Sequence, residues 1–285
     1  MLELLSNIKQ FWGGVMERID EVFEYYNNGA EIGRLERGLG IVEFDRSKEI
    51  IARYLKDELV IYDIGGGIGK YSEWLAALGH KVSLIELAPV AVEYAKEHMT
   101  VPYEAVTGDA RKIEKPDSSA DMVLLMGPLY HLNSREDRML VLSEARRVLK
   151  DGGILITAGI SKFSSATWAL TVYGSVNDFI DDDIYMDMIR REMKTGEHIR
   201  PKEYPYFISN AYFHTIDGLR NEISEAGFTV RESAAVEGCS WITPDIAGKW
   251  NDPAKRERLL EIIRITEHEE TMMGISPHFI VCASK

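Results

Sequence analysis

Cysteine is scarce in this sequence, with only two in 285 residues. Cys239 and Cys282 lie in separate segments, so neither a disulfide framework nor a Cys-x-x-Cys metal site is expected. Long apolar runs are lacking too, since none approaches the ~20 residues that cross a bilayer. Glu3 interrupts the apolar start of the chain, unlike the layout of a signal peptide. These absences predict a soluble protein of a reducing cytoplasm, without a membrane as partner.

Positive charge is also in short supply. The chain carries 33 Lys and Arg against 46 Asp and Glu, for a formal net charge of −13, and has no run rich in Lys or Arg. Binding DNA or RNA through the phosphate backbone needs a positive surface. A nucleic-acid partner is therefore not expected. The hydrophobic content of 45% is ordinary for a globular protein, and no internal repeat interrupts it.

The strongest signal is a strand, a glycine-rich turn and a helix in direct succession. Residues 59–71 begin with an apolar strand that ends at Asp63, and a helical pattern starts after the turn. The turn contains Gly65, Gly66, Gly67 and Gly69. Such a turn lets a ligand approach the backbone and meet the positive end of a helix. The segment predicts a site for a nucleotide-type cofactor.

Two classes of cofactor use a turn of this kind. Dinucleotide sites follow G-x-G-x-x-G/A, in which the last small residue lets helix and strand pack closely. Counting from Gly65, the sixth position is Lys70, which is too large for that role. The spacing is instead Asp63-x-Gly65-x-Gly67-x-Gly69, which resembles the first motif of class I S-adenosylmethionine (SAM)-dependent methyltransferases. A purely structural role for the glycines, as turn residues without a ligand, is the alternative.

Two later strands end in acidic residues in register with this motif. One ends at Glu86, followed by Leu87, and another ends at Asp109, followed by Ala110. An acid after the second strand accepts hydrogen bonds from ribose hydroxyls in such sites. Taken alone, Glu86 has the alternative interpretation of a solvent-exposed residue at the end of a strand. By resemblance to the family, Leu87 would pack on the purine ring, and Asp109 and Ala110 would recognise the adenine.

The segment after the fourth strand is where a methyl acceptor would lie. This strand ends at Met126 and runs into Gly127-Pro-Leu-Tyr-His-Leu132, a stretch that resembles small-molecule methyltransferases of the type 11 (UbiE-like) group. Met126 and Gly127 are expected to contact the cofactor. His131 is the first candidate for a general base, because its ordinary pKa of about 6.5 lets it be neutral near physiological pH. An equally supported alternative is that His131 only caps the next helix or hydrogen-bonds the carboxylate of the cofactor.

A histidine at this place also resembles the phosphoethanolamine methyltransferases, in which it works with a tyrosine from the N-terminal helices. Tyr26 would be the catalytic tyrosine here, and Tyr25 would contact the acceptor. The insertion at 161–213 is rich in aromatic rings, most of which are expected to form its own small core. The remaining residues predicted to contact the acceptor are Tyr130, Trp168, Tyr206 and His214. For His214, which precedes a helix N-cap, a purely structural role is the alternative. No metal site is predicted.

Seven strands with helices between the first five predict an α/β, Rossmann-like doubly wound sheet. The family resemblance implies strand order 3-2-1-4-5-7-6 with strand seven antiparallel. We expect an N-terminal helical cap at 1–55 and a SAM-binding domain at 56–285, in which the insertion 161–213 is a substrate lid. The implied function is methyl transfer from SAM to a small-molecule acceptor, with S-adenosylhomocysteine as product, by a monomer or homodimer. The alternative is a protein of this fold that binds SAM or its product for regulation or assembly without turnover.

Overall fold

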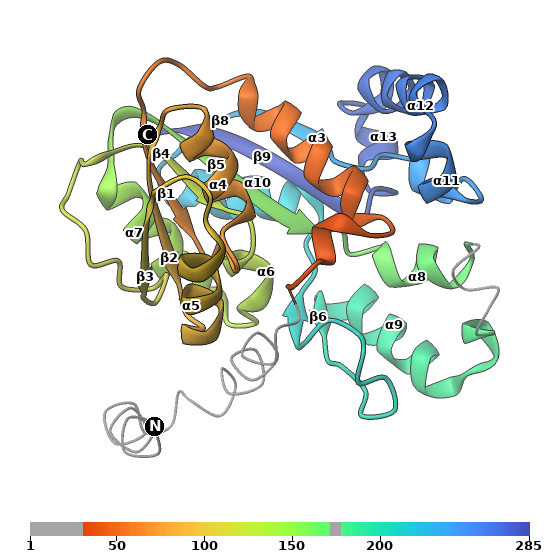
Figure 1. Ribbon diagram of the computed structural model, residues 1–285. Helices are drawn as coiled ribbons and strands as arrows, with labels where there is room; N and C mark the ends of the chain where they lie inside the picture. The colour runs from red at the N-terminus through yellow and green to blue at the C-terminus, as the bar shows by residue number, and fades with distance from the viewer. Residues whose placement is uncertain (1–30, 172–177) are drawn as a thin grey trace.

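One seven-stranded sheet organises the described residues, 31–171 and 178–285, of this computed structural model (Figure 1). Its strands are β1 (Val60–Ile64), β2 (Lys81–Glu86), β3 (Glu104–Thr107), β4 (Ala120–Leu125), β5 (Leu149–Ile160), β8 (Thr229–Ala235) and β9 (His278–Ser284). They lie side by side in the order β3-β2-β1-β4-β5-β9-β8. β9 runs antiparallel to both β5 and β8, whereas the other pairs are parallel. The strand order and the antiparallel seventh strand expected from the sequence are confirmed.

Helices cover both faces of this sheet (Figure 1). One face carries α3 (Gly40–Ala52), α4 (Lys70–Ala77) and α5 (Pro89–His98), and the other carries α7 (Arg135–Val148) and α10 (Ile216–Glu225). Because successive strand residues point to opposite faces, Ile61 packs with α3 and α4, whereas Ile64 packs with α7 and α10. Both faces being apolar explains the near-continuous hydrophobic runs of the parallel strands.

Two of the core helices begin at side-chain caps. Ser134 Oγ accepts a hydrogen bond from the Asp137 N–H at the start of α7, and Thr215 Oγ1 accepts one from the Gly218 N–H at the start of α10. Such caps satisfy N–H groups that the first turn of a helix leaves without a partner. Between β4 and α7 lies the short helix α6 (Pro128–His131). The Ser134 cap therefore fixes where α7 begins after this segment.

The insertion after β5 lies to one side of the sheet (Figure 1). It contains α8 (Ser164–Ala169), η4 (Phe179–Asp181), α9 (Asp183–Thr195) and a two-stranded sheet of β6 (Glu197–His198) and β7 (Ala211–Tyr212). Phe179 and Tyr185 stack with ring centroids 4.5 Å apart, and both are buried with Met188. Several of its rings thus form a core within the insertion, as the sequence predicts. Its role as a lid stays a prediction.

Two further segments complete the described chain. Between β8 and β9 lie η5 (Ser240–Ile242), α11 (Ile246–Asn251), α12 (Pro253–Thr266) and α13 (Glu270–Met273), and η2 (Arg34–Glu36) precedes α3. Glu267, just after α12, pairs with Arg46 and Arg53 of the α3 region and so ties these segments together. Within the ranges that the structure describes, none of the helices has the length and apolar character to span a bilayer. Of the cap expected at 1–55, residues 1–30 lie outside the described residues.

Candidate functional site

The glycine-rich turn after β1 is supported from beneath by Asp63. Its carboxylate is fully buried and accepts a 2.7 Å hydrogen bond from Ser72 Oγ. A Cβ placed on Gly66 would lie 2.4 Å from Asp63 Oδ2, so only glycine fits at that position. Burial raises the pKa of Asp63 to about 6, against the opposing effect of the Ser72 hydrogen bond. Asp63 therefore shapes the turn but does not line the pocket above it.

The turn itself depends on left-handed backbone conformations. Gly65, Gly67 and Gly69 have φ angles of 67°, 58° and 79°, a region that side chains other than hydrogen disfavour. Gly69 is also the residue from which α4 begins. The alternate glycines of the motif are thus each required by the course of the chain.

Glu86 joins this turn to the end of β2. Its carboxylate accepts 2.9 Å hydrogen bonds from the Gly67 N–H and the Ala88 N–H. Burial raises the pKa of Glu86, while these two N–H groups act in the opposite direction. Leu87 follows directly and is half-buried. The acid and the glycine turn predicted to share one ligand are therefore in contact.

Asp109 and Ala110 lie where the chain leaves β3, which pairs with β2. The Asp109 carboxylate is 2.6 Å from Arg111 Nη2 and also accepts a hydrogen bond from the Arg111 N–H. Ala110 packs against the core on the α7 side. Both residues thus stand at the carboxyl edge of the sheet, where parallel α/β folds bind ligands.

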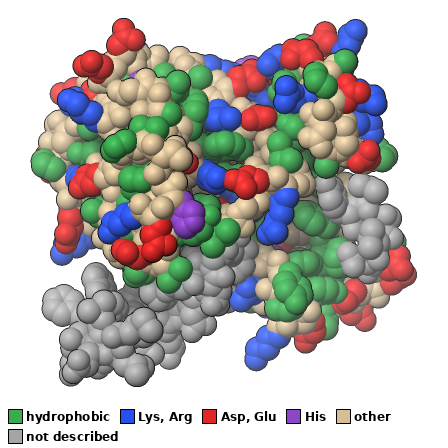
Figure 2. All heavy atoms as spheres, viewed as in Figure 1, with side chains coloured by type: hydrophobic (Ala, Val, Ile, Leu, Met, Phe, Trp, Pro, Cys, Tyr) green, Lys and Arg blue, Asp and Glu red, His purple; other side chains and the backbone are tan. Residues whose placement is uncertain are grey.

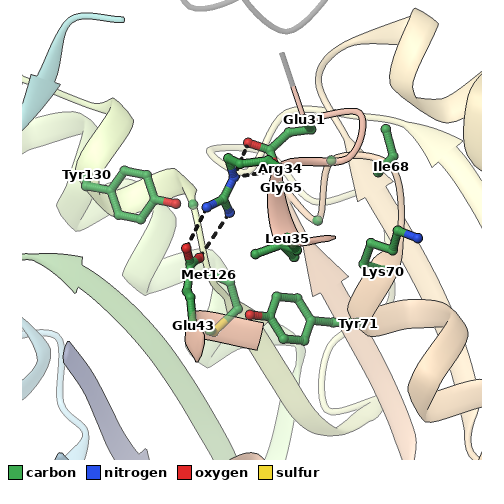
Figure 3. Close-up of a pocket in the computed structure, with 13 residues that line it drawn as sticks. Glu31, Arg34, Leu35, Glu43, Gly65, Ile68, Lys70, Tyr71, Met126 and Tyr130 are labelled. Atoms are coloured by element: carbon green, nitrogen blue, oxygen red, sulfur yellow. Dashed lines mark hydrogen bonds and ion pairs between the residues drawn. The ribbon is translucent and has the colours of Figure 1, made fainter. Parts of the chain in front are cut away.

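A small pocket lies in front of the glycine turn (Figure 3). It is lined by Glu31, Arg34, Leu35, Glu43, Gly65, Gly66, Gly67, Ile68, Lys70, Tyr71, Met126, Gly127 and Tyr130. The pocket thus brings together six residues that the sequence predicts to bind cofactor or acceptor: Gly65, Gly66 and Gly67 of the turn, Met126, Gly127 and Tyr130. Tyr71 and the residues before Gly65 were not predicted to line it.

Arg34 occupies the middle of this pocket between two carboxylates (Figure 3). Its Nη1 and Nη2 lie 2.6 and 3.0 Å from the two carboxylate oxygens of Glu43, and its Nε lies 2.9 Å from Glu31 Oε1. Although burial opposes it, the charges of Arg34 and His278 lower the pKa of Glu43. No sequence motif marks these residues, because Arg34 meets the turn only through the packing of η2 and α3.

Glu43 also belongs to a cluster with Glu237 and His278, whose potential ligand atoms all lie within 4.8 Å of one another. His278 Nδ1 is 2.7 Å from Glu237 Oε1 and 3.8 Å from Glu43 Oε2. Burial lowers the pKa of His278, but the two carboxylates outweigh it and raise the pKa to about 9. The imidazole is then protonated and already paired. We assign this cluster to ion pairing rather than to a metal.

His131 stands at the end of α6, beside the pocket. Its ring centroid is 4.7 Å from that of Tyr130, and a Cβ on Gly127 would lie 4.0 Å from His131 Cδ2. Burial, and then the charge of Arg34, lower the pKa of His131 to about 3. The imidazole is therefore neutral near pH 7, but it binds a proton far more weakly than an ordinary histidine. The sequence does not show the burial or the nearby cation, and the role of His131 as a base or as a cap or cofactor contact stays a prediction.

The remaining predicted acceptor contacts lie elsewhere. Tyr206 is 94% exposed, and neither it nor Trp168 on α8 lines the pocket. His214 is buried, with its Nε2 3.4 Å from Glu222 Oε2, as expected of the structural alternative. None of these three side chains lines this pocket, and their contact with an acceptor stays a prediction. Tyr25 and Tyr26 lie outside the described residues.

Known proteins match the part of the chain that builds this site. Residues 62–157 match the family described as a methyltransferase domain. This range contains the glycine turn, Glu86, Asp109 and His131. The match supports a class I SAM-dependent methyltransferase domain of the UbiE-like kind at residues 62–157. SAM is the cofactor that this family implies, and the resemblance stated from the sequence is confirmed.

Curated relatives match a longer stretch of this chain, but the match spans less than two thirds of their own length. The ubiquinone biosynthesis O-methyltransferase of Xanthomonas campestris is 29% identical over 161 residues, which are 53% of this chain and 61% of the relative. The protein of the same name from Cereibacter sphaeroides is 28% identical over 167 residues, 52% of this chain and 64% of the relative. The match thus leaves more than a third of each relative without a counterpart here.

Solved structures share the fold over most of this chain. A SAM-dependent methyltransferase of Methanosarcina mazei has a TM-score of 0.56 at 20% identity, covering 83% of this chain and 96% of that one. One of Archaeoglobus fulgidus has a TM-score of 0.54 at 15% identity, with coverages of 89% and 97%. The [4+2]-cyclase SpnF has a TM-score of 0.52 at 18% identity, with coverages of 85% and 81%. At these identities, the likeness shows the fold alone.

Proposed function

We propose that this protein binds SAM and transfers its methyl group to a small-molecule acceptor. One observation carries the proposal: within the matched domain, the Glu86 carboxylate is hydrogen-bonded to the Gly67 N–H of the glycine turn. This contact places an acid for the ribose directly beside backbone that a ligand can approach.

The residues present fit this cofactor. The turn offers bare backbone at Gly65, Gly66 and Gly67, and a Cβ on Gly127 would come within 3.2 Å of the Gly65 carbonyl oxygen. A Cβ on Gly67 would point into the pocket toward Glu31, whereas one on Gly65 or Gly66 would clash with Pro128 or Asp63 and distort the turn. As the resemblance implies, Glu86 would hold the ribose, and Asp109, Ala110 and Leu87 would hold the adenine. When bound, SAM supplies a methyl group that is already activated on a sulfonium.

His131 is proposed to orient the acceptor rather than to remove its proton. With a pKa of about 3, its imidazole is neutral and accepts a hydrogen bond, but it gains little by binding a proton. Orientation is a large effect in itself, since well-placed reacting groups reach effective molarities of roughly 10⁵ M or more. Tyr130, next to His131 and in the pocket, is proposed as a second contact of the acceptor.

A small molecule is proposed as the acceptor because of the charge of the chain. The net charge of −13 opposes a polyanion, and on the face shown in Figure 2 the Lys and Arg side chains are interspersed with Asp and Glu. The curated relatives in Xanthomonas and Cereibacter are named as O-methyltransferases. A hydroxyl of a small molecule is therefore the first acceptor group to test.

Methyl transfer is tested by incubating the protein with methyl-labelled SAM and a small-molecule extract, followed by a differential mass screen. We expect label in one or a few extract compounds, and none when Gly67→Val replaces the wild-type protein. Stoichiometric SAM binding by calorimetry without any transfer of label would instead favour a binding module. Preferential binding of NAD would overturn the cofactor assignment.

A further inference from the structure

Arg34 has two carboxylate partners that hold it in unequal ways. Glu43 accepts two parallel hydrogen bonds from Nη1 and Nη2, whereas Glu31 has both its oxygens on the single Nε, at 2.9 and 3.0 Å. Parallel paired bonds between a guanidinium and a carboxylate are the stronger arrangement. Glu43 is also near the protonated His278, while among the described residues Glu31 pairs with Arg34 alone. Glu31 is therefore the partner that exchanges more easily.

Glu31 lies in the space that a ligand of the glycine turn needs. A Cβ placed on Gly67 would lie 3.2 Å from Glu31 Cγ and 3.9 Å from its carboxylate carbon. The pocket in front of the turn has a cavity volume of about 40 Å³, whereas small-molecule sites measure about 300–1,000 Å³. Figure 3 shows Glu31 and Glu43 on opposite sides of the Arg34 guanidinium. A ligand group that enters the space between Gly67 and Arg34 must consequently displace Glu31.

We propose that Glu31 is an internal competitor of the cofactor, and that the amino-acid carboxylate of SAM replaces it on Arg34 Nε. This inference rests on the proposed function. The exchange keeps Arg34 paired on both sides, which avoids the high cost of an unpaired buried charge. No covalent bond changes. The contact makes the site selective for ligands that carry a carboxylate, because only these offer Arg34 a substitute for Glu31.

The test compares two ligands by calorimetry: S-adenosylhomocysteine and 5′-methylthioadenosine, which has the nucleoside and the thioether but no amino-acid end. In Glu31→Gln, we expect S-adenosylhomocysteine to bind about tenfold more tightly, a difference of about 1.4 kcal/mol. Binding of methylthioadenosine should stay within twofold. Glu36→Gln is the matched control, since Glu36 is exposed and pairs with Lys70 of the same region. It should change neither affinity.

Arg34→Gln should bring the affinity for S-adenosylhomocysteine to within about threefold of that for methylthioadenosine. An unchanged or weaker affinity of Glu31→Gln for S-adenosylhomocysteine would overturn the exchange. So would an equal gain for both ligands. Either result leaves cofactor binding, and with it the proposed function, intact. If the folded wild-type protein binds neither ligand, the proposed function fails and the exchange fails with it.

Discussion

Two buried carboxyl groups near the glycine turn ionise differently because their neighbours differ. Burial raises the pKa of Asp63 to about 6, since Ser72 supplies a hydrogen bond but no positive charge. Glu43 is buried as well, yet Arg34 and His278 lower its pKa. The same side-chain chemistry thus supports a turn in one case and a buried ion pair in the other.

The pKa of Asp63 predicts a specific dependence of stability on pH. The folded-state pKa of Asp63, about 6, exceeds the ordinary value of 3.8. The contribution of protonated Asp63 to the stability of the fold is therefore complete below about pH 4 and is lost as the pH rises through about 6. At 1.36 kcal/mol per pKa unit, the loss is about 3 kcal/mol. Urea unfolding from pH 4 to 7 should show this loss in the wild type relative to Asp63→Asn. Other carboxyl groups cancel in that comparison, and a constant difference across this range would contradict the assignment.

Gly67→Val should abolish SAM binding while the protein stays folded. Its φ of 58° strains any L side chain, and the added atoms point at the space beside Glu31 where the ligand meets the backbone. Calorimetry with SAM measures the effect. Gly152→Val is the matched control, because its φ of 74° imposes a similar strain but no atom lies within 4 Å of the new Cβ. Normal SAM binding by Gly67→Val would mean that the glycines only shape the turn and do not contact a ligand.

One guanidinium joins three elements around the segment after β4. Arg138 on α7 is 2% exposed and donates from Nε and Nη2 to the Glu222 carboxylate on α10. Its Nη1 donates to the carbonyl oxygens of Leu132 and Asn133, and its Cζ lies 3.8 Å from the ring centroid of Tyr212 on β7. The chain that follows His131 is therefore held by α7, α10 and the insertion together.

Glu222→Gln should lower the free energy of unfolding by ~3–5 kcal/mol, because it leaves the Arg138 charge buried without a carboxylate. In the wild type, the ionised Glu222 carboxylate contributes fully to the stability of the fold above about pH 4.5. This contribution is lost as the pH falls through the Glu222 pKa of about 2. Chemical denaturation at pH 7 measures it. Glu225→Gln on the same helix removes an exposed pair with Arg135 and should change the free energy of unfolding far less. Equal effects of the two variants would show that burial of the Arg138 pair is unimportant.

The described chain contains a core in the insertion that is separate from those on the two faces of the sheet. Phe179, Tyr185, Tyr204 and Phe207 supply its rings, with centroids 4.5 to 6.1 Å apart. Ala211 and Phe213 of the insertion pack in the sheet core, but the part around Phe179 has a core of its own. That part can therefore loosen without unfolding the sheet.

Phe179→Ala should therefore loosen the insertion selectively. Truncating a buried phenylalanine typically costs ~3–5 kcal/mol, here confined to the core around Tyr185. Limited trypsin digestion with mass spectrometry should show faster cleavage within 161–213, while calorimetry shows unchanged binding of S-adenosylhomocysteine. Leu170→Ala, at a side chain that is 78% exposed, is the control and should digest like the wild type. Loss of cofactor binding in Phe179→Ala would mean that the insertion and the sheet fold as one unit.

The cofactor half of the site was predictable because it is local in the chain. Asp63 and the glycines follow one another through β1, the turn and α4, and backbone conformations such as those at Gly65 and Gly67 leave a direct mark on residue type. Strand periodicity and the caps at Ser134 and Thr215 are local for the same reason. The strand order needed the family resemblance, because hydrophobic periodicity does not say which strands become neighbours.

The charged residues around the glycine turn are brought together only by the tertiary structure. Arg34 meets Gly67 through Glu31, and Glu43 meets His278, whose strand is the last of the chain. The pKa of His131 likewise depends on its burial and on Arg34. Charge interactions depend on distance in space and on the exclusion of water, neither of which is written in the spacing of residues. The sequence by itself therefore determined the fold class and the glycine cradle, whereas packing determined the charges that face it.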